Sequence, residues 1–217
     1  SLVVVVLVAG ALLLAPGVTA LFALAVGALA FALTHWRLSL GVRVTAIAAA
    51  GLLVVAPLLP FLARPIGVAL FGPVAPGVLA LKAWQKVVTL EPVRLVTGHG
   101  LETALRGRIF GILPINAPTT MLFELWYELG VVGAFAAAFA LYGAIHRAGR
   151  DATVLAPCAM AAFATAFAIG CVGVGLVTIW WLTTLSMAIL TFVAIERGQF
   201  RSRRPKVGLI PRLPARS

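Results

Sequence analysis

Two acidic residues, Glu124 and Glu128, lie four positions apart at the start of a long apolar run. On a helix this spacing places both carboxylates on one face. Carboxylates at the start of such a run are costly unless they are paired, and Arg106 and Arg108 in the preceding segment are natural partners. The pair is a candidate catalytic site. The alternative, which is the commoner use of such residues, is that ion pairs only anchor the segment to the helix.

Five cations in the same preceding segment form a second candidate group. Guanidinium groups bind phosphate oxygens in a bidentate fashion, so the set could hold a phosphate or pyrophosphate near a membrane surface. The alternative for each cation alone is attraction to lipid headgroups or plain solubility. Because the cations share their segment with acidic residues and glycine turns, we favour a ligand site. Its members are Lys82, Lys86, Arg94, Arg106 and Arg108.

One histidine, His99, lies between Gly98 and Gly100 in this segment. Imidazole is the side chain whose ordinary pKa lies nearest neutral pH, so His99 is a candidate general base. A lone histidine in a loop is more often structural, and both interpretations stay open. No metal-ligand spacing occurs in the sequence, and we expect no metal ion and no cofactor.

The elements that position these residues are long apolar runs. Of the residues, 62% are hydrophobic and 11% are charged, whereas soluble domains have about 25% charged residues. Each run but the first is close to the roughly 20 residues that cross a bilayer. We therefore expect an all-α integral membrane protein with about six transmembrane helices, the first of them truncated. The runs cover residues 2–15, 17–35, 43–62, 121–145, 152–174 and 176–195.

The net charge of +11 reflects membrane topology rather than nucleic-acid binding. Cations lie between the apolar runs and in the basic tail, residues 197–217, which the positive-inside rule places in the cytoplasm. The first three spans then occupy residues 1–62 and the last three residues 121–196. The long connection 63–120 is extracytoplasmic, and its residues 77–90 have the pattern of an amphipathic helix at the membrane interface.

Three pieces of the sequence resemble the O-antigen ligase and polysaccharide polymerase superfamily of the bacterial envelope. A loop helix with Trp84 leads to Pro92, and a Gly-His-Gly turn follows at residues 98–100. The chain then enters the membrane with residues 125–133, which read Leu-Trp-Tyr-Glu-Leu-Gly-Val-Val-Gly. The last piece is similar to the family's Glu-Leu-Gly-x-x-Gly ending motif.

The resemblance implies a reaction and its partners. Family members move a glycan from a polyprenyl-pyrophosphate carrier to a glycan or lipid acceptor, as in lipopolysaccharide synthesis, on the outer face of the bacterial inner membrane and without metal or nucleotide. Charged loop residues handle the pyrophosphate, and a loop histidine helps to activate the acceptor. Carried onto this chain, the catalytic residues are His99, Glu124 and Glu128.

The chain departs from the family at one motif. The family's His-Asn dipeptide falls on Thr119-Thr120, and its usual glutamine falls on Glu124. A threonine hydroxyl does not replace an imidazole as a base at neutral pH, so His99 or a carboxylate would have to substitute. Two alternatives therefore stay open, a noncatalytic polysaccharide-assembly partner and a transporter subunit, although the apolar runs lack the polar mid-membrane groups that a transporter needs.

Overall fold

The computed structural model describes residues 18–150, 154–175 and 178–201, and every regular element in these ranges is a helix. The expected first run, 2–15, and most of the basic tail lie outside the described residues. The elements are α2 (Val18–Trp36), α3 (Leu38–Val55), the 3-10 turn η1 (Ala56–Leu58), α4 (Leu59–Phe71), α5 (Pro76–Leu90), α6 (Pro92–Thr97), α7 (Thr103–Ile109), α8 (Met121–Ala148), α9 (Ala156–Val172) and α10 (Ile179–Arg201).

Four helical stretches in the described chain are long and apolar enough to cross a membrane: Val18–Trp36, Leu38–Phe71, Met121–Ala148 and Ile179–Gly198. The apolar helix α9 is shorter. Several apolar helices of this length confirm the all-α class and favour a multi-pass membrane protein. Several helix bounds differ from those of the apolar runs; α3, for example, begins at Leu38 rather than at residue 43. The reason is that Arg43 lies on the exposed side of the helix, where a charged side chain does not end it.

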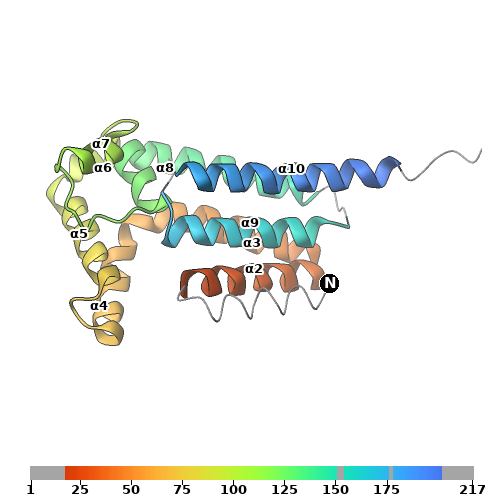
Figure 1. Ribbon diagram of the computed structural model, residues 1–217, viewed down its shortest axis with the longest axis horizontal. Coiled ribbons are helices and arrows are strands. Elements are labelled where there is room, and N and C mark those ends of the chain that lie inside the picture. The colour runs from red at the N-terminus through yellow and green to blue at the C-terminus, as the bar shows by residue number, and fades with distance from the viewer. Residues whose placement is uncertain (1–17, 151–153, 176–177, 202–217) are drawn as a thin grey trace, which may run out of the picture.

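The long helices form a bundle in which α2 packs on α9 and α3 packs on α8. Small residues allow the first pair to approach closely, since a Cβ atom on Gly27 of α2 would collide with Thr165 Oγ1 of α9. Figure 1 shows the turn between α2 and α3 and the ends of α8 and α10 together at one end of the bundle. The helices α4 to α7 gather at the opposite end.

The helix α8 changes direction at Gly130, which has φ 64° and ψ −161°, outside the helical region. The turn before this break is the centre of the core. Phe123 is 1% exposed, and Trp126 donates its indole N–H to the carbonyl oxygen of Leu53 at 2.6 Å. Trp84 of α5 joins the same hydrophobic cluster. The start of α8 is therefore fixed by contacts with α3 of the bundle and with α5 of the loop segment.

The segment 63–120 is folded rather than extended, and its first residues continue α4 to Phe71. A helix, α5, covers Pro76–Leu90 where the sequence pattern predicts one over 77–90. Val78 and Trp84 are buried, whereas Lys82 and Lys86 are exposed. Pro92, which follows the end of this helix, is the first residue of α6, because proline lacks only an N–H that the first helical turn leaves unpaired.

Candidate functional site

The Gly-His-Gly turn docks onto the break in α8. The His99 backbone N–H donates to the carbonyl oxygen of Tyr127 at 2.9 Å, and the Gly100 N–H donates to that of Glu128 at 3.0 Å. A break in a helix disturbs the hydrogen bonds of the carbonyls in the preceding turn. The turn at 98–100 supplies donors to two of these carbonyls, so the break in α8 and the loop stabilise each other.

Two glycines make this docking possible. A Cβ atom on Gly130 would lie 2.6 Å from the Gly98 nitrogen and 2.6 Å from the Val96 carbonyl oxygen. A Cβ atom on Gly98 would collide with the Glu128 carbonyl oxygen. Both glycines also have positive φ, 73° at Gly98 and 64° at Gly130, which side chains rarely adopt. The glycine of the Glu-Leu-Gly motif is therefore required by a close backbone crossing.

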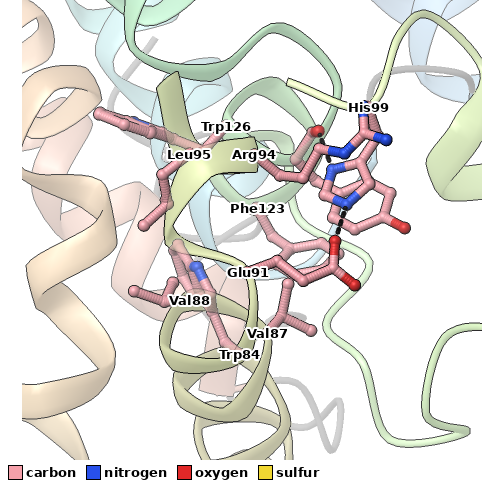
Figure 2. A pocket seen from close by; sticks show the side chains of 10 residues that line it. Trp84, Val87, Val88, Glu91, Arg94, Leu95, His99, Phe123 and Trp126 are labelled. Carbon is pink, nitrogen blue, oxygen red and sulfur yellow. Dashed lines mark hydrogen bonds and ion pairs between the residues drawn. The ribbon is translucent and has the colours of Figure 1, made fainter. Parts of the chain in front are cut away.

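His99 is fixed by three contacts, two of which Figure 2 shows as dashed lines. Its ring stacks on Tyr127 with centroids 4.0 Å apart. Its Nδ1 atom lies 2.9 Å from the Tyr127 carbonyl oxygen, and its Nε2 atom lies 2.9 Å from Glu91 Oε2. A carbonyl oxygen only accepts, so Nδ1 carries a proton in this bond. Nε2 and the Glu91 carboxylate therefore share the position at which a proton can be exchanged.

The pocket beside His99 is small. Its volume is about 20 Å³, which is close to the space of a single water molecule. Glu91 and Arg94 supply its charged groups, and most of the remaining wall is apolar (Figure 2). This pocket admits a proton or a water, but a sugar ring would require the loop to move. The lining residues are Trp84, Val87, Val88, Glu91, Arg94, Leu95, His99, Phe123, Trp126 and Tyr127.

The two carboxylates of α8 bind the next loop helix, α7. Arg108 donates one guanidinium N–H to Glu124 Oε1 at 2.8 Å and another to the Pro118 carbonyl oxygen at 2.8 Å. Glu128 Oε1 accepts from the Ala104 backbone N–H at 3.3 Å, which lies in the first turn of α7. Glu128 thus does the work of an N-cap side chain for that helix. Glu124 is 5% and Glu128 is 7% exposed.

These carboxylates line a cavity of about 160 Å³. It lies between α7, the start of α8 and the connection from α9 to α10, and Gly175 of that connection leaves the room for it. A Cβ atom on Gly175 would lie 2.5 Å from Glu124 Oε1. With two carboxylates and one guanidinium, the cavity suits hydroxyl donors better than a phosphate. Its lining residues are Leu105, Arg108, Thr119, Glu124, Glu128, Gly175 and Thr178.

The prediction that Arg108 pairs with one of the two carboxylates is confirmed, because Arg108 binds Glu124. The same prediction for Arg106 is wrong. Arg106 instead lies 3.4 Å from Glu102, and both side chains are exposed. The physical reason is helical geometry, because residues two apart on α7 point to nearly opposite sides. An anchoring role, the alternative considered for the carboxylates, describes the contacts that Glu124 and Glu128 make here.

The remaining predicted site residues do not share this cavity. His99 and Arg94 line the smaller pocket instead, so the candidate base His99 is separated from the candidate carboxylates Glu124 and Glu128. His99 stacks on Tyr127, with ring centroids 4.0 Å apart. Lys82 and Lys86 are exposed on α5 and line neither space.

The threonine pair has two separate roles. Thr120 is the N-cap of α8 and accepts from the Phe123 backbone N–H at 3.3 Å, as its position before the apolar run predicts. Thr119 lies at the edge of the cavity beside the carboxylates. The position that holds a histidine in the resembled family therefore faces the candidate site, whereas the next position is structural.

Sequence reasoning missed three residues of the two pockets. Glu91 comes just before Pro92 at the end of the amphipathic helix, and an acid at that position near a lone histidine was the available signal. Gly175 and Thr178 come from a connection far along the chain. No local pattern indicates that this connection reaches the start of α8, where the Met121 N–H donates to the Val174 carbonyl oxygen at 3.0 Å.

Comparisons with known proteins identify no related protein. No family model matches the chain, and no curated protein or solved structure matches it. Within the described ranges, no group of three or more histidine, cysteine or acidic side chains is arranged to hold a metal ion. The motifs and the geometry around α8 are therefore the basis on which a function is inferred.

Proposed function

We propose that this chain is a membrane glycan-transferring enzyme of the O-antigen ligase type. It would transfer or polymerise a saccharide from a polyprenyl-pyrophosphate carrier onto a glycan or lipid acceptor at the outer face of the bacterial inner membrane. The proposal includes the topology of about six spans with a cytoplasmic C-terminus. The positive-inside rule supports this orientation, because Arg37 follows the end of α2 and Arg147 and Arg197 lie near the ends of α8 and α10. These ends lie together, opposite the loop helices.

One observation carries the proposal: the three motif pieces, far apart in sequence, pack on one another. Trp84 of α5 meets Phe123 of α8 edge to face, with ring centroids 5.8 Å apart. His99 stacks on Tyr127, and the Gly98 backbone crosses Gly130. Unrelated loop motifs would not be expected to pack together at the start of one helix. Motifs that together build a reaction site would be expected to do so.

The cavity with Glu124 and Glu128 is the proposed acceptor site. Carboxylate oxygens accept hydrogen bonds from sugar hydroxyls, and Thr119 and Thr178 add hydroxyl groups at the wall. In the transfer step, the acceptor O–H gives its proton to a carboxylate or to the His99–Glu91 pair. The acceptor oxygen then bonds to the anomeric carbon, and the bond from that carbon to the pyrophosphate oxygen breaks, which releases the polyprenyl pyrophosphate.

The exposed cations of the loop are the groups proposed to bind the pyrophosphate. Arg108 is neutralised by Glu124 at 2.8 Å, so we assign it to positioning Glu124 rather than to holding phosphate. Lys82, Lys86 and Arg94 are exposed, and Arg106 is only loosely paired with Glu102 at 3.4 Å. Exposed guanidinium and ammonium groups of this kind bind a lipid-linked phosphate that approaches from the membrane surface.

The test is glycan transfer by the full-length protein in vesicles that contain a polyprenyl-pyrophosphate oligosaccharide. We expect Glu124→Gln and Glu128→Gln to lower the transfer rate by about 100-fold or more, the size of a lost acid–base group. Glu102→Gln is the matched control, since it removes an exposed carboxylate of the same segment, and should leave the rate within about twofold. Wild-type rates in both buried-carboxylate variants would contradict the proposal.

A noncatalytic assembly partner is the second candidate, and the threonine pair favours it. Thr120 is committed to capping α8, and Thr119 offers a hydroxyl where the resembled family has an imidazole. The same assay separates the two candidates. No transfer by the wild type, together with transfer gained by Thr119→His, would indicate a chain that has lost the base. Saccharide uptake without transfer would instead indicate a transporter.

A further inference from the structure

The helix α4 is an apolar helix that cannot cross a membrane. It belongs to an apolar stretch of 34 residues, Leu38–Phe71, which as one straight helix would be about 51 Å long. The hydrocarbon core is only roughly 30 Å thick. The 3-10 turn Ala56–Leu58 divides the stretch, so that α3 keeps 18 residues and about 27 Å. The 13 residues of α4, about 20 Å, are left over.

Figure 1 shows where α4 goes: α4 and α5 run across the direction of the long helices, and α4 projects sideways past the bundle. We call the two helices, Leu59–Phe71 and Pro76–Leu90, the α4–α5 arm. The helices pack on each other at Gly67, where a Cβ atom would lie 3.1 Å from Val78 Cγ2. Arg64, the charged residue of α4, donates to Gln85 Oε1 of α5 at 2.7 Å.

The exposed surface of α4 is apolar, and three of its residues, Ile66, Leu70 and Phe71, also line an open cavity of about 510 Å³ beside α5. Leu62 and Ile66 are 62% and 61% exposed, and Leu70 and Phe71 are 69% and 75% exposed. A contiguous apolar surface of this kind marks a site of contact with a membrane or a partner. Since its one arginine is turned toward α5, α4 offers no charge of its own to water on this face.

The outer side of α5 is cationic. Lys82 and Lys86 are exposed and lie four residues apart, hence on one side of the helix. An arm with an apolar helix and a lysine-bearing helix has the composition of segments that lie in the bilayer interface. The arm also begins where α3 ends, and α3 belongs to a candidate membrane span. The arm therefore starts at the membrane surface.

We propose that the α4–α5 arm lies in the plane of the bilayer surface. The exposed face of α4 contacts lipid acyl chains, and Lys82 and Lys86 contact the phosphates of anionic headgroups. Trp84 of the same α5 packs on Phe123 of α8, so the arm sets the height of both pockets at the level of the headgroups. This inference rests on α4, α5 and their connection to α3 rather than on the reaction, although it shares Lys82 and Lys86 with the proposed pyrophosphate site.

Its test measures the immersion of single nitroxide labels in the full-length protein. Labels are placed by Ile66→Cys, Leu70→Cys and Thr89→Cys in a background with Cys158→Ala and Cys171→Ala. The protein is reconstituted in vesicles of phosphatidylethanolamine and phosphatidylglycerol. Oxygen, which concentrates in lipid, and a water-soluble nickel chelate serve as relaxation agents. Labels at Phe139 of α8, 80% exposed, and at Ile115 of the loop, 103% exposed, calibrate lipid and water.

We expect the labels at Ile66 and Leu70 to resemble Phe139, with oxygen favoured over the chelate. The label at Thr89, on the lysine-bearing side of α5, should lie at headgroup depth, with an oxygen preference between those of Phe139 and Ile115. Chelate access at Ile66 and Leu70 equal to that at Ile115 would overturn the proposal, because α4 would then face water. Protection of both labels from both agents would also overturn it and would indicate that a protein, such as a second copy of this chain, covers the face.

A second measurement tests the lysines without relying on α4. A bimane fluorophore at Thr89→Cys should be quenched at least about twofold more by headgroup-labelled phosphatidylglycerol than by headgroup-labelled phosphatidylcholine, since lysines attract anionic lipid. The preference should vanish in Lys82→Gln/Lys86→Gln and persist in Lys82→Arg/Lys86→Arg. Equal quenching by both lipids in the wild-type arm would overturn the assignment of the lysines to headgroup phosphates.

Discussion

The backbones of Gly98 and Gly130 cross so closely that neither residue has room for a side chain. A Cβ atom on Gly130 would lie 2.6 Å from the Gly98 nitrogen. This crossing joins the loop turn that carries His99 to the helix that carries Glu124 and Glu128. The geometry of both pockets depends on it.

Replacing Gly130 with alanine should therefore destabilise the protein. At φ 64° and ψ −161°, a residue with a side chain costs about 1–3 kcal/mol in backbone strain alone, and the contact with Gly98 adds to this. Thermal unfolding of the full chain in lipid nanodiscs measures the loss. The control is Gly143→Ala on the same helix, where an added Cβ atom meets nothing within 4 Å. Equal melting temperatures for the two variants would show that the crossing is not tight.

Removal of Arg108 should also destabilise the chain. Arg108→Met leaves Glu124, which is 5% exposed, without its guanidinium partner at 2.8 Å, and such a loss typically costs about 3 kcal/mol. The double variant Arg108→Met/Glu124→Gln should recover much of this, because the uncompensated charge is gone. A double-mutant cycle from thermal unfolding measures the coupling. Arg106→Met, the matched exposed arginine, should change stability by less than about 0.5 kcal/mol.

His99 should matter for activity more than for folding. His99→Phe keeps a ring to stack on Tyr127 but removes both nitrogen contacts, including the 2.9 Å contact with Glu91. Under the proposed function, we expect glycan transfer to fall by about 100-fold while the melting temperature changes little. Glu91→Gln should show a smaller loss of the same kind. If His99→Phe transfers glycan at the wild-type rate, His99 is a structural residue.

The two adjacent threonines should respond differently to the same change. Thr120→Ala removes the side chain that accepts from the Phe123 N–H at 3.3 Å, and loss of an N-cap costs about 1 kcal/mol. Thr119→Ala, at the edge of the cavity, should leave the stability within about 0.5 kcal/mol. Thr120→Ser should restore the wild-type value, because serine caps equally well. A larger loss from Thr119→Ala than from Thr120→Ala would contradict this division of roles.

Much of the helical framework is predictable from the sequence. The apolar runs from residue 17 onward mark α2, α3 and α8 to α10, because a bilayer span requires about 20 apolar residues whatever they pack against. The amphipathic pattern predicts α5, and Thr120 before an apolar run predicts the start of α8. The break at Gly130 is not predictable in this way, since an isolated glycine in a helix is usually tolerated.

The site was predictable only in part. The four-residue spacing of Glu124 and Glu128 indicates a shared face, and Arg108 is a correct partner for the first of them. Sequence alone does not distinguish Arg108 from Arg106, because that depends on how α7 is rotated against α8. It also does not connect His99 with Glu91, whose contact is made only when α6 folds back onto the broken helix.

The sequence by itself thus determined the class of the protein, the apolar helices and the residue types able to do chemistry. These follow from composition and from local periodicity, which act within one element. The tertiary structure alone decided that His99 and the two carboxylates occupy separate pockets, that Glu128 caps α7 and that Gly175 opens the cavity at Glu124. Those features depend on contacts between segments that are distant in the sequence, and such contacts have no signature in either segment taken alone.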